Sequence, residues 1–420
     1  MQQTRWSGKL TWGLGFFLAA NVYLQPGNPS SLRAMDLLSL LLWIWLLRHL
    51  LSGGVRHTAL VTLALLHTVP LFWGCFAYLQ GLRPTMLLSL RWLLALPWGY
   101  CLYLLAENKR HRTQFLWGLW FGLLLNVGVL ILQYGGHEPL TYRLGLAAPD
   151  SLLITINHFL LRNPGLHGHA NASAAVVSLI LPISLFLYYR GEARLWMPLT
   201  SMTALLTASH ITSSRSPLIV AVIGFVIVAI TSRHFIRTMI LAVFVAALTV
   251  PLWMWYGLPG GAIRWVDTAH MSANTSERLA SNATAIRIAG DNFWGLGIQA
   301  SQEAMTDVLE NPASHNAFLQ IAIIYGPGLA ALLLVALVLL AWHALAGIRR
   351  IWALEALLAL HLCGLFCFEE HLNNPTFICL TSWLVVASVA RFGSLPAVVI
   401  QRSVSSTTAA PAVTVNRPLN

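Results

Sequence analysis

The chain has 420 residues, of which 57% are hydrophobic and only 9% carry a charge. Soluble globular proteins contain about 25% charged residues, so this composition excludes a soluble globular protein and indicates one that is embedded in a membrane. The formal net charge of +11 would suit a nucleic-acid-binding protein, but the basic residues are spread over many short hydrophilic segments between apolar runs. They therefore do not form the basic patch that nucleic-acid binding requires, and we expect no nucleic-acid partner.

Apolar segments follow one another along most of the chain, and a helix of about 20 apolar residues crosses the hydrocarbon core of a bilayer. The segments are residues 10–24, 35–50, 58–79, 87–105, 114–134, 170–189, 195–211, 216–231, 236–254, 317–343, 351–368 and 374–391. They predict an all-α, polytopic membrane protein with about 12 transmembrane helices. We expect a single transmembrane helical domain over residues 1–400.

The charge distribution predicts the orientation of these helices. With the N-terminus in the cytoplasm, about twice as many lysines and arginines fall on the cytoplasmic side as on the outer side, as the positive-inside rule requires. An even number of spans places the C-terminus in the cytoplasm as well. The tail 403–420 has few bulky apolar residues, so we predict that it is disordered.

The longest hydrophilic segment, residues 255–316, is predicted to be a periplasmic loop that contains helices and carries the catalytic site. It contains several arginines, a Gly295-Leu-Gly297 turn and the sequence Ser314-His315-Asn316 directly before the next apolar run. The planar guanidinium group of arginine suits phosphate oxygens, and histidine titrates near neutral pH. These residues together predict phosphate recognition combined with proton transfer.

His315 is the candidate general base. We expect Ser314 to be the N-cap of a helix that starts at Asn316, which places the imidazole on the first helical turn. There the helix dipole disfavours the imidazolium and favours nearby anions, and a neutral imidazole can accept a proton from a hydroxyl group. The alternative is a capping or interfacial histidine at the membrane surface.

Three arginines are candidates for binding phosphate. Arg215 lies in the short turn Ser213-Ser214-Arg215-Ser216-Pro217 between two spans. Arg278 and Arg287 are nine residues apart on one predicted helix, so they point to opposite faces and at most one of them faces a shared site. The alternatives are an ion pair with Glu277 or another outer carboxylate for Arg278, and lipid headgroup contact for Arg287.

Further polar residues stand beside or inside apolar segments. Arg162, His167, His169 and Asn171 precede or open the span 170–189. The His-x-His pair has no evident third ligand, so we predict a polar entrance to a substrate groove and no metal. Arg91 lies within a span, where a charge is costly, and it could bind a lipid phosphate or form a structural pair. Because the chain also has no Asp-x-Asp pair, the candidate chemistry uses arginines in place of a metal ion.

The order and placement of these motifs resemble the O-antigen ligase/polymerase superfamily of bacterial envelope glycosyltransferases. The resemblance covers residues 160–330 and is carried by four motifs. These are the Gly-x-His-x-His-x-Asn171 entrance, the Ser-Ser-Arg215-Ser turn, the Ser-Glu-Arg278-Leu279 helix leading to Gly295-Leu-Gly297, and His315-Asn316 followed by Gly326.

The resemblance implies an O-antigen ligase in the bacterial inner membrane, with its active site facing the periplasm. Such an enzyme transfers O-antigen polysaccharide from undecaprenyl diphosphate to the lipid A–core oligosaccharide, with inversion and without a metal or other cofactor. Its partners are the lipid-linked glycan donor, the lipid A–core acceptor and membrane lipids. The implied catalytic residues are His315, Arg215 and Arg278, and the implied substrate-binding residues are Arg287, Asn316, Arg162, His169, Asn171 and Arg91.

Three alternatives stay open. An O-antigen polymerase and a protein O-oligosaccharyltransferase belong to the same superfamily. A lipid or glycan transporter belongs to another functional class, and it predicts ionisable residues at mid-membrane depth and interrupted helices in paired positions.

Overall fold

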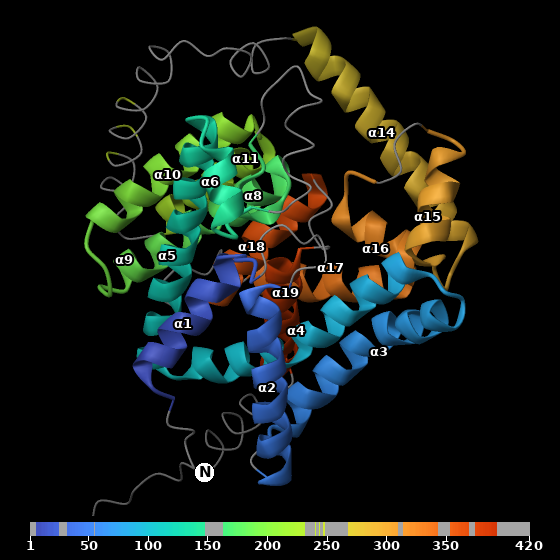
Figure 1. Cartoon of the computed structure of the whole chain (residues 1–420), viewed down its shortest axis with the longest axis horizontal. Coiled ribbons are helices and arrows are strands. Elements are labelled where there is room, and N and C mark those ends of the chain that lie inside the picture. Colours follow the sequence, from blue (N-terminus) through green and yellow to red (C-terminus); the bar gives the residue numbers. More distant parts are fainter. Residues whose placement is uncertain are drawn as a thin grey trace, which may run out of the picture.

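The computed structural model describes residues 6–24, 32–53, 55–147, 163–231, 268–309, 314–342, 353–368 and 374–392, together with the single positions 240, 243 and 247. Within these residues the chain is all-helical, and the only β contact is an isolated bridge between Tyr23 and Arg33. Figure 1 shows the helices gathered around α18 and α19 at the centre. The predicted all-α class is therefore confirmed.

The helices begin and end close to the predicted apolar segments. Their bounds are α1 Gly8–Ala19, α2 Ala34–Leu51, α3 His57–Leu79, α4 Arg83–Glu107, α5 Lys109–Tyr134, α6 Glu138–Arg143, η1 Gly165–His167, α8 Ala170–Ser178, α9 Ile180–Tyr189, α10 Trp196–Thr212, α11 Ser216–Thr231, α14 Thr268–Asp291, α15 Gly297–Thr306, α16 Ala317–Tyr325, α17 Pro327–Trp342, α18 Ala353–Phe368 and α19 Pro375–Phe392. Apart from positions 240, 243 and 247, the predicted span 236–254 lies outside the described residues, as does the tail 403–420.

Five helices among the described residues are long and apolar enough to cross a membrane: Ala34–Leu51, His57–Leu79, Thr85–Glu107, Lys109–Tyr134 and Ala170–Tyr189. Shorter apolar helices add to them, including those at 327–342, 353–368 and 375–390. The structure therefore supports a membrane protein. The number of spans and their orientation stay predictions.

Burial differs strongly between helices. Most side chains of α8, α9, α18 and α19 are buried, whereas α2 and α3 expose large apolar side chains such as Leu41, Ile44 and Leu65. Exposed leucine and isoleucine along a whole helix face are what contact with lipid tails requires. We infer that α18 and α19 form the interior of the helix bundle and that α2 and α3 lie at its outside.

The predicted span 317–343 is two helices, because the chain breaks between α16 and α17. Gly326 has φ +97°, and Pro327 has no N–H with which to bond the carbonyl of Ile323. That carbonyl instead accepts the N–H of Leu296 at 2.8 Å. The hydrophilic segment before α15 thus supplies the hydrogen bond that proline removes from the helix.

Close backbone approach holds this segment in the break. A side chain added at Gly326 would lie 2.5 Å from the carbonyl oxygen of Phe293, and one added at Gly295 would overlap the backbone of Ile324. Only glycine permits such an approach at a positive φ. The Gly295-Leu-Gly297 turn of the sequence is therefore a backbone contact between the hydrophilic segment and the helix bundle.

The predicted span 170–189 is also interrupted, but only slightly. Leu179 joins α8 to α9 with φ −62° and ψ −18°, which is still a right-handed helical conformation. The chain direction is kept, and Ala170–Tyr189 remains one continuous apolar stretch.

Contacts between helix ends define two ends of the bundle. At the first, which we call the site end, Thr376 at the start of α19 donates to the Leu18 carbonyl of α1 at 2.8 Å. At the opposite end, Thr113 of α5 donates to Glu192, which follows α9, at 2.7 Å.

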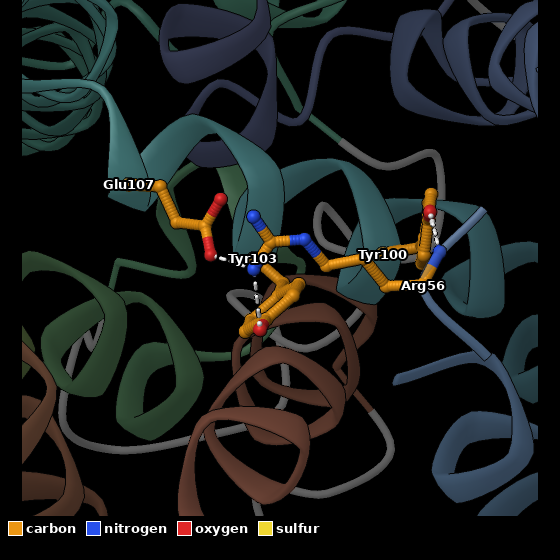
Figure 2. Close-up of polar contacts among 4 residues, drawn as sticks. All are labelled: Arg56, Tyr100, Tyr103 and Glu107. Carbon is orange, nitrogen blue, oxygen red and sulfur yellow. Dashed lines mark hydrogen bonds and ion pairs between the residues drawn. The ribbon is translucent and has the colours of Figure 1, made fainter. Parts of the chain in front are cut away.

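A second contact at the opposite end joins the start of α3 to the end of α4. Figure 2 shows the Arg56 side chain directed at Tyr103 and Glu107, while the backbone N–H of Arg56 donates to the Tyr100 hydroxyl at 3.0 Å. Each of these acceptors lies on one helix, α4, at a spacing of about one turn. These contacts of Arg56 hold the α2–α3 connection against α4.

Candidate functional site

The last turns of α18 are the point at which several separate segments of the chain meet. The ring of Phe366 contacts Phe318 in the first turn of α16, with ring centroids 5.7 Å apart and planes at 77°. It also contacts Phe377 in the first turn of α19, at 6.0 Å and 82°. Edge-to-face aromatic contacts of this kind fix the relative positions of helices. The starts of α16 and α19 are therefore held at the end of α18.

Arg278 reaches the same place from α14. Its half-buried side chain donates a hydrogen bond from Nη1 to the carbonyl oxygen of Phe368, the last residue of α18, at 2.9 Å. The last carbonyls of a helix have no partners within the helix and carry partial negative charge, so a guanidinium is stabilised there. The last turn of α18 thus holds the positively charged Arg278 side chain at the site end.

His315 is placed by its neighbours in the chain. The side chain of Ser314 is fully buried, and its Oγ donates to Oδ1 of Asn282 at 3.0 Å. The backbone N–H of Ser314 donates to Oε1 of Gln320 at 2.9 Å. Two amide side chains from α14 and α16 therefore hold the residue directly before His315, whose own side chain is partly exposed.

Arg278 lies on the face of α14 that contacts the His315 segment. Asn282 follows Arg278 by four residues, which is one helical turn, so both side chains lie on one face. Arg278 bonds to α18 and Asn282 bonds to Ser314. Arg287 lies nine residues beyond Arg278 and is exposed. Of the two arginines, Arg278 is therefore the one on the face of α14 that contacts the His315 segment.

The N-cap of α16 differs from the sequence prediction. Asn316, and not Ser314, caps the helix, because its side-chain oxygen accepts the backbone N–H groups of Phe318 and Leu319 at 2.9 and 3.1 Å. The helix begins at Ala317, so His315 stands just before the first turn instead of on it. The Ser314 hydroxyl lies one step earlier in the chain: its oxygen accepts the backbone N–H of Asn316 at 3.2 Å while it donates to Asn282.

Arg215 stands at the start of α11, where its carbonyl accepts the N–H of Ile219 at 3.0 Å. The turn before it depends on Ser213, which has a left-handed conformation with φ 51°. The hydroxyl groups of Ser209 and Ser214 are buried beside this turn without a hydrogen-bond partner among the described residues. The partly exposed Arg215 side chain therefore stands next to polar atoms that still have bonding capacity.

Packing of α11 on α18 brings Arg215 toward Arg278. Val220 of α11 packs so closely on Gly364 of α18 that an added Cβ at Gly364 would lie 2.8 Å from Cγ1 of Val220. α11 begins four residues before Val220, and α18 ends four residues after Gly364. Since four residues rise about 6 Å along a helix, the start of α11 and the end of α18 lie within one turn of the same contact.

His169 and Asn171 lie at the start of α8. His169 occupies the N-cap position, with φ −147° and ψ 134°, and is exposed, whereas Asn171 is partly buried. Further along α8, Oγ of Ser178 lies 2.7 Å from Nε2 of His361 in α18. The end of α8 therefore contacts the middle of α18, and α9 continues the packing on α18. Arg162 lies outside the described residues.

His167 connects this entrance to α19. Its Nδ1 lies 3.1 Å from the amide nitrogen of Asn374, just before α19. Burial in the first place, and the positive charge of Arg33 in the second, lower the pKa of His167 to about 3, although the Ala19 carbonyl acts in the opposite direction. His167 is therefore neutral at physiological pH, and Nδ1 accepts the amide N–H of Asn374.

Arg91 belongs to a separate group of charges on α2 and α4. It is partly buried in α4, with the charges of Arg33 and Asp36 close enough to act on it. Asp36 also accepts the backbone N–H of Arg33 at 3.0 Å. Two arginines and one aspartate thus lie near one another, and this group carries a net positive charge that could meet an anionic part of a substrate.

The described residues contain no group of three or more histidine, cysteine, aspartate or glutamate side chains that could hold a metal ion. Two residues that position the site, Asn282 and Gln320, were missed by sequence reasoning. Asn282 could have been found from its one-turn spacing after Arg278, and Gln320 from its place as an amide in an apolar run. Sequence spacing alone, however, does not reveal that both bond to Ser314.

Arginine side chains can bind an anion, and a histidine side chain can take up a proton near neutral pH. Arg215, Arg278 and His315 come from segments far apart in the chain, and each of these segments contacts α18 or continues into a helix that does. No protein-family model matches this sequence, and a search of curated proteins finds no match.

Proposed function

We propose that this protein is a membrane glycosyltransferase of the O-antigen ligase type. It moves O-antigen polysaccharide from undecaprenyl diphosphate to the lipid A–core oligosaccharide, at the periplasmic side of the bacterial inner membrane. The single observation that supports the proposal is that the helices carrying Arg215, Arg278 and the His315 segment each contact the C-terminal part of α18. The motif resemblance selects the substrate class.

The two arginines have the chemistry that a diphosphate leaving group needs. Guanidinium groups make charge-assisted, often paired hydrogen bonds to phosphate oxygens. Both arginine side chains are partly exposed, and Arg278 bonds to the last residue of α18. The two guanidinium groups would stabilise the negative charge that develops on the diphosphate as the bond to the sugar breaks. Electrostatic stabilisation of this kind is usually the largest single contribution to catalysis.

His315 would act as the general base. The acceptor hydroxyl attacks the anomeric carbon, the bond between that carbon and the diphosphate oxygen breaks, and the hydroxyl proton moves to the imidazole. One displacement inverts the anomeric configuration. Proton transfer of this kind contributes about 10²- to 10⁴-fold to a rate. The hydrogen bonds from Ser314 to Asn282 and Gln320 would hold the imidazole in position.

An O-antigen polymerase and a protein O-oligosaccharyltransferase would use the same donor and the same three residues, but a different acceptor. We favour the ligase because the chain has a modest hydrophilic loop and the His315 motif. The acceptor is therefore what an experiment must establish.

A transporter is the alternative of another class, and the break between α16 and α17 is the observation that favours it. Interrupted helices in transporters expose free backbone groups to a substrate at mid-membrane depth. Here the Ile323 carbonyl at the break bonds to the Leu296 N–H, and glycines bring the two backbones together. The break is thus filled by the protein itself, which favours an enzyme.

A gene deletion separates these functions. Cells that lack the protein are expected to make complete lipid A–core without long O-chains, while polymerised glycan accumulates on the lipid carrier. Loss of a polymerase would leave core that bears one repeat unit, and loss of a transporter would trap single repeat units on the cytoplasmic side. The matched comparison is between the deletion strain complemented with the wild-type protein and the same strain complemented with His315→Ala. Either of the other two glycan patterns would overturn the ligase proposal.

A further inference from the structure

α1 and α5 pack side by side in the same direction, at the periphery of the bundle (Figure 1). A side chain added at Gly118 would overlap the backbone of Trp12, and one added at Gly122 would overlap the backbone of Phe16. The contacts advance together by four residues on each helix, so the helices are parallel. A Gly-x-x-x-Gly pair is the usual means by which membrane helices approach this closely.

Because the two helices are parallel, both begin at the opposite end of the bundle. Ser7 caps α1 by accepting the N–H of Leu10, and Asn108 caps α5 by accepting the N–H of Arg110. Each helix N-terminus carries partial positive charge. Lys9, on the first turn of α1, and Arg110, on the first turn of α5, add two full charges at the same place.

A cavity of about 480 Å³ lies between these helix starts. It is lined by Gly8, Lys9, Trp12, Arg110 and Gln114. Lys9 and Arg110 are exposed, and Oε1 of Gln114 is buried without a hydrogen-bond partner among the described residues. The cavity therefore combines two cations, which suit a phosphate, with an acceptor, which suits a hydroxyl or ammonium group.

The surface around the cavity is apolar on one side. Trp12 and Leu10 of α1 are 37% and 48% exposed, and Phe121 of α5 is 42% exposed. Trp12 stacks on Phe16 and contacts Phe121, with ring centroids 5.3 and 6.0 Å apart. Tryptophan beside basic residues at a helix end is typical of the headgroup level of a bilayer, where acyl chains lie on one side and water on the other.

We propose that this cavity binds the headgroup of an anionic phospholipid. Lys9 and Arg110 bind the phosphate, Gln114 Oε1 accepts a hydrogen bond from a headgroup hydroxyl, and the acyl chains lie against the apolar surface of Leu10, Trp12 and Phe121. The site is at the end of the bundle away from His315, so it is separate from the proposed transfer reaction and does not depend on it. A bound lipid there would also cover the glycine-packed α1–α5 pair.

The test uses the full-length protein in a zwitterionic detergent, titrated with dioctanoyl phosphatidylglycerol, dioctanoyl phosphatidylcholine and sodium phosphate, with binding measured by calorimetry. The variant is Lys9→Gln with Arg110→Gln. The matched control is Arg48→Gln with Arg194→Gln, which removes the same charge from exposed arginines outside the cavity. Thermal unfolding shows whether each variant is folded. If the double variant does not yield folded protein, the single variant Arg110→Gln takes its place.

We expect phosphatidylglycerol to bind more tightly than phosphatidylcholine, and the cavity variant to weaken its binding by about fivefold for each cation removed. The control variant should bind phosphatidylglycerol nearly as the wild type does. Equal losses in both double variants would show that only general charge attraction acts. Equal binding of the two lipids would also overturn the proposal, as would sodium phosphate binding as tightly as the lipid.

Discussion

The guanidinium of Arg278 donates a hydrogen bond to the carbonyl oxygen of Phe368, at 2.9 Å, and thereby joins α14 to the last turn of α18. The hydrophilic segment between two apolar runs is thus tied to the most buried helices of the bundle. The same face of α14 reaches Ser314 through Asn282. One helix therefore positions both the proposed anion-binding arginine and the proposed base.

Arg278→Lys is expected to lose most glycan transfer, although the charge is kept. A lysine ammonium cannot give two parallel hydrogen bonds, and losing one charge-assisted bond costs about 1.5–3 kcal/mol, or about 10- to 150-fold in rate. Arg287→Lys, on the opposite face of the same helix, is the control and should change the rate much less. Rates are measured in membrane vesicles with a lipid-linked donor, and Arg215→Lys should behave like Arg278→Lys. If the protein is equally active with Lys and with Arg at position 278, this residue only attracts the donor electrostatically.

His315→Ala is expected to abolish transfer, by about 10²- to 10⁴-fold, while the protein stays folded. The side chain is partly exposed and stands outside α16, so its removal leaves the cap at Asn316 in place. His137→Ala, an exposed histidine before α6, is the control. Asn282→Ala should give a partial loss, because it frees Ser314 without removing the base. A well-expressed His315→Ala protein with near-normal activity would remove this histidine from the mechanism.

Gly326→Ala is expected to destabilise the protein by about 1–3 kcal/mol, the cost of holding a non-glycine residue in a strained backbone conformation. Its Cβ would also press on the Phe293 carbonyl and move the turn that packs into the α16–α17 break. Gly328→Ala, two residues further on, meets nothing within 4 Å and is the control. Thermal unfolding in detergent compares the two. Similar unfolding temperatures for both variants would contradict the close packing of this turn.

The stability of the protein is expected to fall as the pH is lowered from about 6.5 toward 3, in part because of His167. Its pKa is lowered from 6.5 to about 3 in the folded state, so between these values the unfolded chain binds a proton that the folded chain does not. Acid therefore favours unfolding. His167→Gln should reduce the pH dependence of the unfolding temperature between pH 7 and about 4. An unchanged slope in this variant would show that other groups cause the effect.

Transfer is expected to survive chelation of divalent ions by EDTA. The proposal assigns stabilisation of the diphosphate to Arg215 and Arg278, and guanidinium groups keep their charge without a metal. Activity is measured before and after chelation, with an Asp-x-Asp glycosyltransferase as a control that should stop. Restoration of lost activity by added magnesium or manganese would show that the arginines do not suffice.

Helix positions could be predicted from the sequence because they depend on local composition: apolar runs and the described helices coincide along most of the chain. The two interruptions could not. At Gly326 the break depends on which distant backbone group replaces the hydrogen bond that Pro327 lacks, and Leu296 is remote in the sequence. Such pairing is a property of packing and leaves no local pattern.

The candidate site was predictable in its residue types and in part of its geometry. The spacing of Arg278 and Arg287 placed them on opposite faces, but only the contact with α18 shows which face packs inward. The cap was assigned to the wrong residue because Ser314 and Asn316 are equally good N-caps in isolation. The structure distinguishes them: Oδ1 of Asn316 accepts the N–H groups of Phe318 and Leu319, and Oγ of Ser314 accepts the N–H of Asn316 itself.

The position of α18 has a consequence for biosynthesis. Arg215, Arg278 and His315 all precede α18 in the chain, yet each is located by contacts with α18 or with segments packed on it. A nascent chain that has inserted only the helices up to α17 holds every proposed catalytic residue but lacks the helix that brings them together. Under the proposed function, synthesis and activity are thereby separated, and the proposed reaction can begin only after α18 has entered the membrane.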